Sequence, residues 1–417
     1  MDENRAMWAE VDEQGRLVMP SEMVERFGLR PGARLRVENL ANNMRLHRPV
    51  SQLAKVYIEP TNRCNLRCVT CMRNSWDEPL GKMTPETFEQ ILDGLKQITP
   101  RPLVFFGGIG EPLFHAQTIE MIERVREIGA PVEIITNGIL LNAERSRRLI
   151  DAHIETLWIS IDGAKPESYA DVRLGAELPR VIENVQTFRS MRRHSFRPMP
   201  EIGINFVAMR RNIHDLPAAL KLALSLGARR FMASNVLPYD QDMRKETLYN
   251  AALTSIAYLP SLWLPRLNIP KMDIDDTTRE AFLGALQSGW NVTFAGNNLG
   301  GANDVCNFIE SGSMAIGWDG SVAPCIPLLH SHTTYLRKRE RLVRRHVIGK
   351  VSEHSLSDLW NDPGYVAYRK RVQSFAFAPC SFCGGCEMLD SNLEDCLGNP
   401  FPVCGGCLWA QALIQCP

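Results

Sequence analysis

Between residue 55 and about residue 240, short β-rich apolar runs alternate with longer stretches of helical spacing. Branched and aromatic residues dominate the short runs, as they do in buried strands. A parallel sheet is the usual product of strands that alternate with helices, so the pattern predicts an α/β fold, a partial (β/α)6 TIM-like barrel. The predicted strands are 56–59, 103–106, 132–136, 156–161, 202–208 and 229–233, and the predicted helices are 84–98, 118–128, 143–152, 178–192 and 216–226.

The chain is too long for one ordinary domain, because 417 residues exceed the usual size of a single core. Its composition changes on both sides of the predicted barrel. We therefore expect three parts: a small β-rich module over 1–50, the barrel over 51–300 and a cysteine-rich region over 301–417. By position alone, residues 236–300 are expected to line or cover the substrate cavity.

The charge balance is neutral, with 47 basic and 47 acidic residues, so no global field favours nucleic acid or an anionic membrane. No apolar run approaches the roughly 18 residues of a membrane-spanning helix, and the polar start is unlike a signal peptide. We therefore expect a cytoplasmic protein. Since that compartment keeps thiols reduced, its 12 cysteines point to metal binding rather than disulfides.

Three cysteines, Cys64, Cys68 and Cys71, lie close together, and no other cysteine precedes Cys306. The spacing lets one loop wrap three corners of an iron-sulfur cube, which usually takes four thiolates. The fourth iron is then open, and an open coordination position distinguishes a reactive metal site from a structural one. A zinc loop, or a redox pair at Cys68 and Cys71, is the alternative.

Polar or glycine-rich motifs follow each of the first four predicted strands. Because chemistry in such barrels occurs at the carboxyl ends of the strands, these motifs are expected to meet at one rim. Each motif alone is equally compatible with a tight turn or a solvated surface. The motifs are the cysteine loop, residues 107–112, residues 136–138 and residues 160–163.

The triplet and its setting resemble the radical S-adenosylmethionine (SAM) superfamily. This resemblance implies that the open iron of a 4Fe-4S cluster holds the amino and carboxylate groups of SAM. It also implies that the reduced cluster donates one electron, and that a 5'-deoxyadenosyl radical then removes a hydrogen atom from the substrate. Thr70 departs from the pattern, since the residue before the third cysteine is often aromatic in the family.

The run after the second strand resembles the family's Gly-Gly-Glu-Pro stretch, which binds the SAM amino group through backbone oxygens. Gly107 and Gly108 match it, and glycines allow a ligand to approach the backbone closely. Ile109 and Gly110 separate them from Glu111, which weakens the match of that glutamate.

Further positions are assigned to the SAM site by the same resemblance. Thr136 and Asn137 follow the third strand. Ser160 and Asp162, with Arg173 downstream, resemble the positions that hold the methionine carboxylate and the ribose hydroxyls. An arginine suits a carboxylate because its planar fork can bond both oxygens. No catalytic acid or base is predicted.

The cysteine-rich region resembles the SPASM extension of radical SAM enzymes, which carries auxiliary clusters. Eight of its nine cysteines would fill two further 4Fe-4S clusters, and the run also resembles a bacterial ferredoxin, so electron relay is one expected role. The family's x2, x5, x3 spacing becomes x2, x2, x9 here, so ligands cannot be assigned to individual clusters; structural zinc is the alternative. The expected ligands are Cys306, Cys325, Cys380, Cys383, Cys386, Cys396, Cys404, Cys407 and Cys416.

Two further features near this region are not assigned to the predicted site. The basic run 337–346 is expected to be a solvated face, or else a docking site for an acidic partner or a phosphate. His330 and His332 follow Cys325, but single histidines are more often structural than catalytic. Both are therefore left out of the predicted site.

The amino-terminal module, through residues 11–20 and 28–37, resembles the swapped-hairpin fold of AbrB-type transcription factors. Proteins of that family dimerise and bind DNA. Residues 1–50 hold eight arginines against eight acidic residues, whereas DNA binding usually shows a basic surface. A docking or dimerising module is therefore expected, and an ordinary β-rich cap on the barrel is the alternative.

Over its full length the chain resembles radical SAM maturases of tungsten-pterin oxidoreductases of the aldehyde ferredoxin oxidoreductase class. The matching residues are 68–76, the AbrB-like start, 404–410 and 416–417. This resemblance implies a protein or peptide substrate, such as a tungsten oxidoreductase, and a low-potential electron donor such as ferredoxin or flavodoxin. The alternatives are a SPASM enzyme that modifies a ribosomal peptide, and an iron-sulfur redox sensor that binds DNA.

Overall fold

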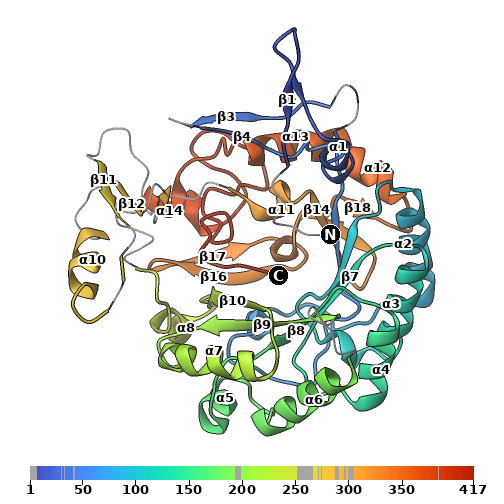
Figure 1. The fold of residues 1–417 in the computed structure, drawn as a ribbon, viewed down its shortest axis with the longest axis vertical. Helices are drawn as coiled ribbons and strands as arrows, with labels where there is room; N and C mark the ends of the chain where they lie inside the picture. The colour runs from blue at the N-terminus through green and yellow to red at the C-terminus, as the bar shows by residue number, and fades with distance from the viewer. Residues whose placement is uncertain are drawn as a thin grey trace.

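The computed structural model describes residues 7–29, 31, 33–40, 43–192, 199–250, 266–270, 272–273, 275–286, 291–294, 297–298, 305–383 and 385–417. Its centre is a nine-stranded sheet in the order β10-β9-β8-β7-β6-β5-β14-β15-β18. The six strands β5 to β10 are parallel and curve into a partial barrel (Figure 1), which confirms the predicted fold class. They are β5 (Lys55–Ile58), β6 (Leu103–Phe106), β7 (Val132–Thr136), β8 (Thr156–Ser160), β9 (Glu201–Ala208) and β10 (Arg230–Asn235).

Helices cover the outer face of this sheet (Figure 1). The five predicted helices are present, and α2 begins where Thr84 accepts a hydrogen bond from the backbone N–H of Thr87 and Pro85 occupies the first turn. A short helix after β8, α5 (Pro166–Val172), was not predicted. The predicted helices are α2 (Pro85–Gln97), α3 (Thr118–Glu127), α4 (Ala143–Asp151), α6 (Leu178–Met191) and α7 (Leu216–Ser225); α8 (Gln241–Lys245), like α5, was not predicted.

Alternate strand residues divide between two hydrophobic clusters, as the pleat of a strand requires. Val56 and Ile58 belong to the cluster that also contains apolar residues of the outer helices. Tyr57, Phe105 and Trp158 point the other way and pack with residues of the carboxy-terminal region, including Phe308 and Leu329. The cysteine-rich region therefore fills the concave side of the barrel.

The cysteine-rich region also extends the sheet. Strand β14 (Ser313–Ile316) pairs in parallel with β5, and β15 (Ser321–Ala323) and β18 (Gly349–Lys350) follow in antiparallel order. The sequence pattern predicted six strands and did not predict this extension. The remaining elements are α11 (Asn307–Glu310), η5 (Ile326–Leu328), the hairpin β16 (His332–Leu336) and β17 (Arg339–Val343), α12 (Leu356–Asn361), α13 (Pro363–Gln373), α14 (Cys380–Cys383) and η6 (Glu387–Asp390).

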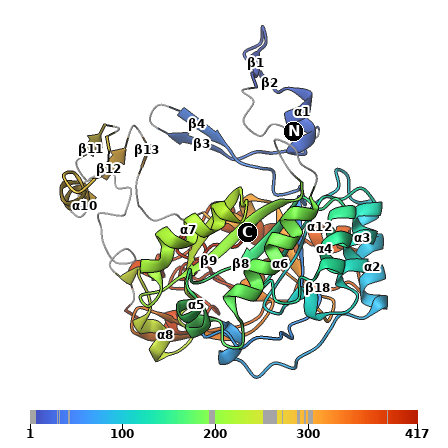
Figure 2. The same cartoon turned by 60° about the horizontal axis from the view of Figure 1, so that its bottom comes forward.

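The amino-terminal module consists of two hairpins whose strands pair only with each other. It projects beyond the helices of the barrel (Figure 2). Large apolar side chains are exposed on it, with Trp8 84% and Met44 67% accessible. Its elements are β1 (Glu10–Val11), β2 (Leu17–Val18), α1 (Ser21–Arg26), β3 (Val37–Leu40) and β4 (Asn43–Leu46).

A three-stranded sheet precedes the cysteine-rich region; it contains β11 (Arg266–Ile269), β12 (Asn291–Phe294) and β13 (Asn297–Asn298), with α10 (Arg279–Leu286) nearby (Figure 2). Within the described ranges, none of the helices combines the length and apolarity needed to cross a membrane.

Candidate active site

A cleft opens at the carboxyl ends of the parallel strands, and the predicted motifs meet in it. It encloses about 930 Å³ including its open mouth. The cleft is lined by most of the predicted residues: Cys64, Cys68, Cys71, Gly108, Glu111, Thr136, Asn137, Ser160 and Arg173.

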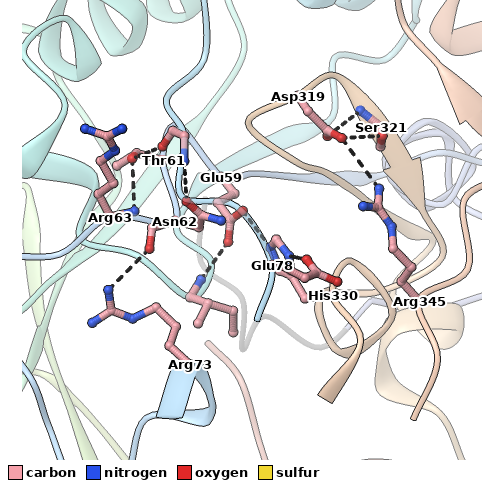
Figure 3. Close-up of polar contacts among 12 residues, drawn as sticks. Glu59, Thr61, Asn62, Arg63, Arg73, Glu78, Asp319, Ser321, His330 and Arg345 are labelled. Carbon is pink, nitrogen blue, oxygen red and sulfur yellow. Dashed lines mark hydrogen bonds and ion pairs between the residues drawn. The ribbon is translucent and has the colours of Figure 1, made fainter. Parts of the chain in front are cut away.

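The cysteine loop leaves β5 and is fixed by polar contacts that the sequence pattern did not reveal (Figure 3). The Asn62 side chain accepts from the backbone N–H of Gly81 at 2.8 Å and donates to Pro79 O at 3.0 Å. Arg73, in η1 (Met72–Ser75), donates to Leu66 O at 3.0 Å, and its Nε lies 3.3 Å from Cys71 Sγ. A guanidinium thus lies beside one of the three thiols.

These thiols fit a cluster better than they fit free thiol chemistry. Burial raises the pKa of Cys64, and it raises the pKa of Cys68 to about 11 although the nearby Arg173 acts in the opposite direction. Thiolates in such a pocket require bound positive charge, which iron supplies. Within the described residues, no three His, Cys, Asp or Glu side chains are grouped tightly enough for a single metal ion. The ligands of an iron-sulfur cube bind different corners, so their side chains can lie farther apart than the ligands of a single metal ion.

The glycine loop after β6 shapes one wall of the cleft. Gly108 has φ +143°, in the region that favours glycine, and a Cβ there would lie 2.7 Å from the Glu59 side chain. Gly107 is not among the lining residues; its Cβ would lie 2.5 Å from the Phe105 ring. Gly107 therefore permits packing, whereas Gly108 presents backbone to the cleft.

Glu111 ties the second motif to the third. Its carboxylate accepts from Thr136 Oγ1 at 2.7 Å and from the backbone N–H groups of Asn137 and Leu113 at 2.8 and 3.0 Å. Burial raises the pKa of Glu111, and these three hydrogen bonds oppose that rise. The inserted residues therefore leave Glu111 at the rim, with its oxygens engaged by the protein.

Asp162 and Arg173 form a buried pair. Asp162 Oδ2 lies 2.8 Å from Arg173 Nη2, and Oδ1 accepts from the backbone N–H of Val207 at 2.8 Å. Asp162 is fully buried and is not among the residues that line the cleft, whereas Arg173 lines it. Burial alone lowers the pKa of Arg173, but Asp162, Cys68 and Tyr169 together outweigh it, and the net shift is upward. This geometry favours a positioning role for Asp162 and ligand contact for Arg173.

Leu237 also lines the cleft, and sequence reasoning missed other lining residues, among them Asn205 and Trp409. Asn205 is a polar residue on the concave side of β9, and its Oδ1 is buried with no hydrogen-bond partner among the described residues. A polar residue in an otherwise apolar strand is the sequence feature that could have identified Asn205 as a site residue. Leu237 agrees with the expected role of 236–300, but residues 251–265 and much of 287–300 lie outside the described residues.

The structure separates eight of the tail cysteines into two groups. The first group, here called the inner cysteines, lines one cavity and consists of Cys306, Cys325, Cys404 and Cys407. The second group, the outer cysteines, surrounds α14: Cys380 is buried near Cys386 and Cys396, and Cys383 lies on the same helix. The ninth, Cys416, is partly buried near Cys407 and Lys55.

One arginine of the basic run faces both groups, so the expected solvated face is wrong for this residue. Arg341, on β17, is 3% exposed and lines the cavity of the inner cysteines. Burial lowers its pKa, while the thiols of Cys407 and Cys380 act to raise it. Its Nη1 donates to Leu389 O at 2.8 Å.

Two family models match the chain. Residues 58–223 match the Radical SAM superfamily, and residues 306–387 match SPASM, an iron-sulfur cluster-binding domain. The chain is also 29% identical over 366 residues to a tungsten-containing aldehyde ferredoxin oxidoreductase cofactor-modifying protein of Pyrococcus furiosus, covering 87% of this chain and 96% of that protein. It is 28% identical over 202 residues to a PqqA peptide cyclase of Rhodopseudomonas palustris, covering 48% of this chain and 52% of that one.

Solved structures share the fold. Streptococcus suis SuiB bound to precursor peptide SuiA gives a TM-score of 0.52 at 17% identity, over 76% of this chain and 67% of that one. SuiB bound to S-adenosylmethionine gives 0.51 at 18% identity, over 82% and 72%.

Proposed function

Because the chain is a radical SAM enzyme with a SPASM domain, whose cofactors are 4Fe-4S clusters and S-adenosylmethionine, we propose that it matures a tungsten-pterin oxidoreductase or its cofactor. The likeness to the Pyrococcus furiosus cofactor-modifying protein, which extends over nearly all of that protein, carries the choice of substrate. The three cysteines at the wall of the cleft support the choice of radical SAM chemistry.

The bound cluster would supply one electron that cleaves SAM to methionine and a 5'-deoxyadenosyl radical, which abstracts hydrogen from the substrate. Cys64, Cys68 and Cys71 would hold that cluster and leave one iron open. The Gly108 backbone would receive the SAM amino group, and Arg173 its carboxylate. The electron would come from a low-potential donor such as ferredoxin or flavodoxin.

The cysteine-rich region would hold two auxiliary clusters, one on the inner cysteines and one on the outer cysteines. Cys416 is then not needed as a ligand. We keep the division into 1–50, 51–300 and 301–417, and we place the protein in the cytoplasm, where thiols stay reduced. The exposed apolar residues of the amino-terminal module support a docking or dimerising role.

The proposal is tested on anaerobically reconstituted protein reduced with dithionite. We expect formation of 5'-deoxyadenosine from SAM, and a change in the mass of the oxidoreductase or of its extracted pterin when that partner is added. About 12 irons per chain would match three cubes, whereas roughly four irons with bound zinc would leave the tail as scaffolding. Failure to cleave SAM would refute the proposal.

A peptide-modifying enzyme is the second candidate, favoured by the similarity to a PqqA peptide cyclase. The same assay decides between the two, because a peptide encoded beside the enzyme would then change mass while the oxidoreductase and its pterin would not. The DNA-binding sensor makes a different prediction: sequence-specific, salt-sensitive DNA binding without turnover of SAM.

A further inference from the structure

His330 lies between two carboxylates at the junction of the barrel and the cysteine-rich region (Figure 3). It follows η5, five positions after Cys325, and is 4% exposed. Its Nε2 is 2.8 Å from Glu59 Oε1, and its Nδ1 is 2.5 Å from Glu78 Oε2. Glu59 directly follows the first barrel strand and Glu78 follows the cysteine loop, so one side chain of the tail contacts two segments of the barrel.

With both carboxylates ionised, the geometry requires the charged form of His330. An ionised carboxylate only accepts hydrogen bonds, so both ring nitrogens must carry hydrogen. Burial alone lowers the pKa of His330, but the two glutamates raise it to about 9. The edge of Trp76 packs against the ring at 4.3 Å between centroids. Burial lowers the pKa of the neighbouring His332 to about 4, so His332 stays neutral, and Arg345 helps to lower the pKa of Glu78.

Glu59 connects this cation to the SAM cleft. Its other oxygen, Oε2, accepts from the backbone N–H of Ile109 at 2.8 Å. A Cβ at Gly108 would lie within 2.7 Å of the Glu59 side chain, so the carboxylate supports the glycine loop from beneath. Glu59 is 1% exposed, and a buried carboxylate without a cationic partner is strongly unfavourable. Removing the charge of His330 would therefore move Glu59 or protonate it, and either change disturbs the loop.

We propose that His330 is a positioning residue that holds Glu59 under the glycine loop, so that the docked cysteine-rich region sets the backbone geometry that receives the SAM amino group. The inference rests on the proposed function for the place of SAM. It assigns a role to a histidine outside the three SAM-site cysteines and outside both tail cysteine groups.

The test compares SAM binding by reconstituted full-length variants at matched iron content. In His330→Gln, the SAM dissociation constant should rise about tenfold, the size expected when one charge-assisted hydrogen bond in a buried site is lost. His330→Lys retains a cation and should recover part of the affinity. The SAM-induced change in the electron paramagnetic resonance (EPR) spectrum of the reduced cluster should weaken in parallel with affinity.

Two further variants separate positioning from general damage. Glu78→Gln leaves His330 and Glu59 in place but removes one carboxylate, so we expect a smaller loss of affinity in the same direction. Arg339→Gln breaks the Arg339–Asp390 pair of the nearby hairpin, at 2.7 Å, and should bind SAM like the wild type.

The pH dependence provides a second readout. The pKa of His330 lies above its ordinary value, so its contribution is complete below about pH 6.5 and is lost as the pH rises through about 9. The ratio of SAM affinities, wild type over His330→Gln, should therefore fall towards one above pH 9. Normalising to the variant cancels the titration of the SAM amino group itself.

Wild-type affinity in His330→Gln at full iron content would overturn the inference, and so would a ratio that does not change with pH. Loss of tail iron in both His330→Gln and Glu78→Gln would show a purely structural role. Binding and cleavage are measured separately. A wild-type protein that binds SAM without cleaving it would refute the proposed function, while the affinity ratio would still decide the role of His330.

Discussion

The two cysteine regions build their sites in opposite ways. Cys64, Cys68 and Cys71 lie on one loop at the edge of a cleft. The inner cysteines come from separate segments between Cys306 and Cys407 and lie among core residues. A site on one loop can be open and reactive because the fold does not depend on it, whereas a site assembled from distant segments is part of the fold. The first should lose chemistry when a ligand is removed, and the second should lose stability.

The largest effect is expected from Cys68→Ala. Without this ligand the SAM-binding cluster cannot be held by three thiolates, so 5'-deoxyadenosine formation should fall by at least about a thousandfold. Since the ligand loop is local, both auxiliary clusters should stay, with about eight irons per chain. Iron analysis and EPR on the same sample check both parts. Unfolding or loss of auxiliary clusters in this variant would contradict the comparison.

Cys404→Ala and Cys383→Ala should differ, because one thiol is buried and the other is exposed. Cys404 Sγ contacts the hydroxyl group of the buried Tyr368 at 3.1 Å, so its loss should remove one cluster and lower the melting temperature markedly. Cys383→Ala should remove the other cluster, also about four irons, with a smaller thermal shift. EPR identifies which cluster is missing. If both variants lose the same cluster, the division into inner and outer cysteines is wrong.

Sequence reasoning succeeded where contacts are local. The barrel strands and their helices follow from periodicity, and the observed boundaries lie within two residues of those predicted. The rim was predictable because parallel strands direct their carboxyl ends to one edge. The seven-residue α5 was missed because it is too short to show a helical period. Glu111 kept its place at the rim because the backbone N–H of Ile109 bonds to Glu59 and Gly110 packs against the backbone of residues 61–63, which no spacing rule describes.

Long-range contacts were not predictable in the same way. Glu59 and Glu78 lie 271 and 252 positions from His330, so the sequence shows three unrelated polar residues. The pairing of β14 with β5 is equally distant, and a short apolar run does not reveal its partner strand. The tail cysteines could not be assigned to groups for the same reason: Cys404 and Cys407 follow Cys396 in the chain but lie with Cys306 and Cys325.

The smallest expected effect concerns the charge of Arg341, which faces the inner and outer cysteines. It therefore tests the tail region separately from the SAM-binding cluster. Arg341 is buried, and the thiols whose electrostatic effect it experiences belong to both the inner and the outer cysteines. A nearby positive charge stabilises the reduced, more negative cluster and so raises its potential. Arg341→Gln should therefore lower both auxiliary potentials by tens of millivolts, on the order of the 59 mV that corresponds to a tenfold change for one electron. Arg341→Lys should shift them less, and the SAM-binding cluster should keep its potential in an EPR-monitored titration. A shift of all three potentials would mean that the variant disturbs the fold, and no shift would mean that Arg341 serves packing alone.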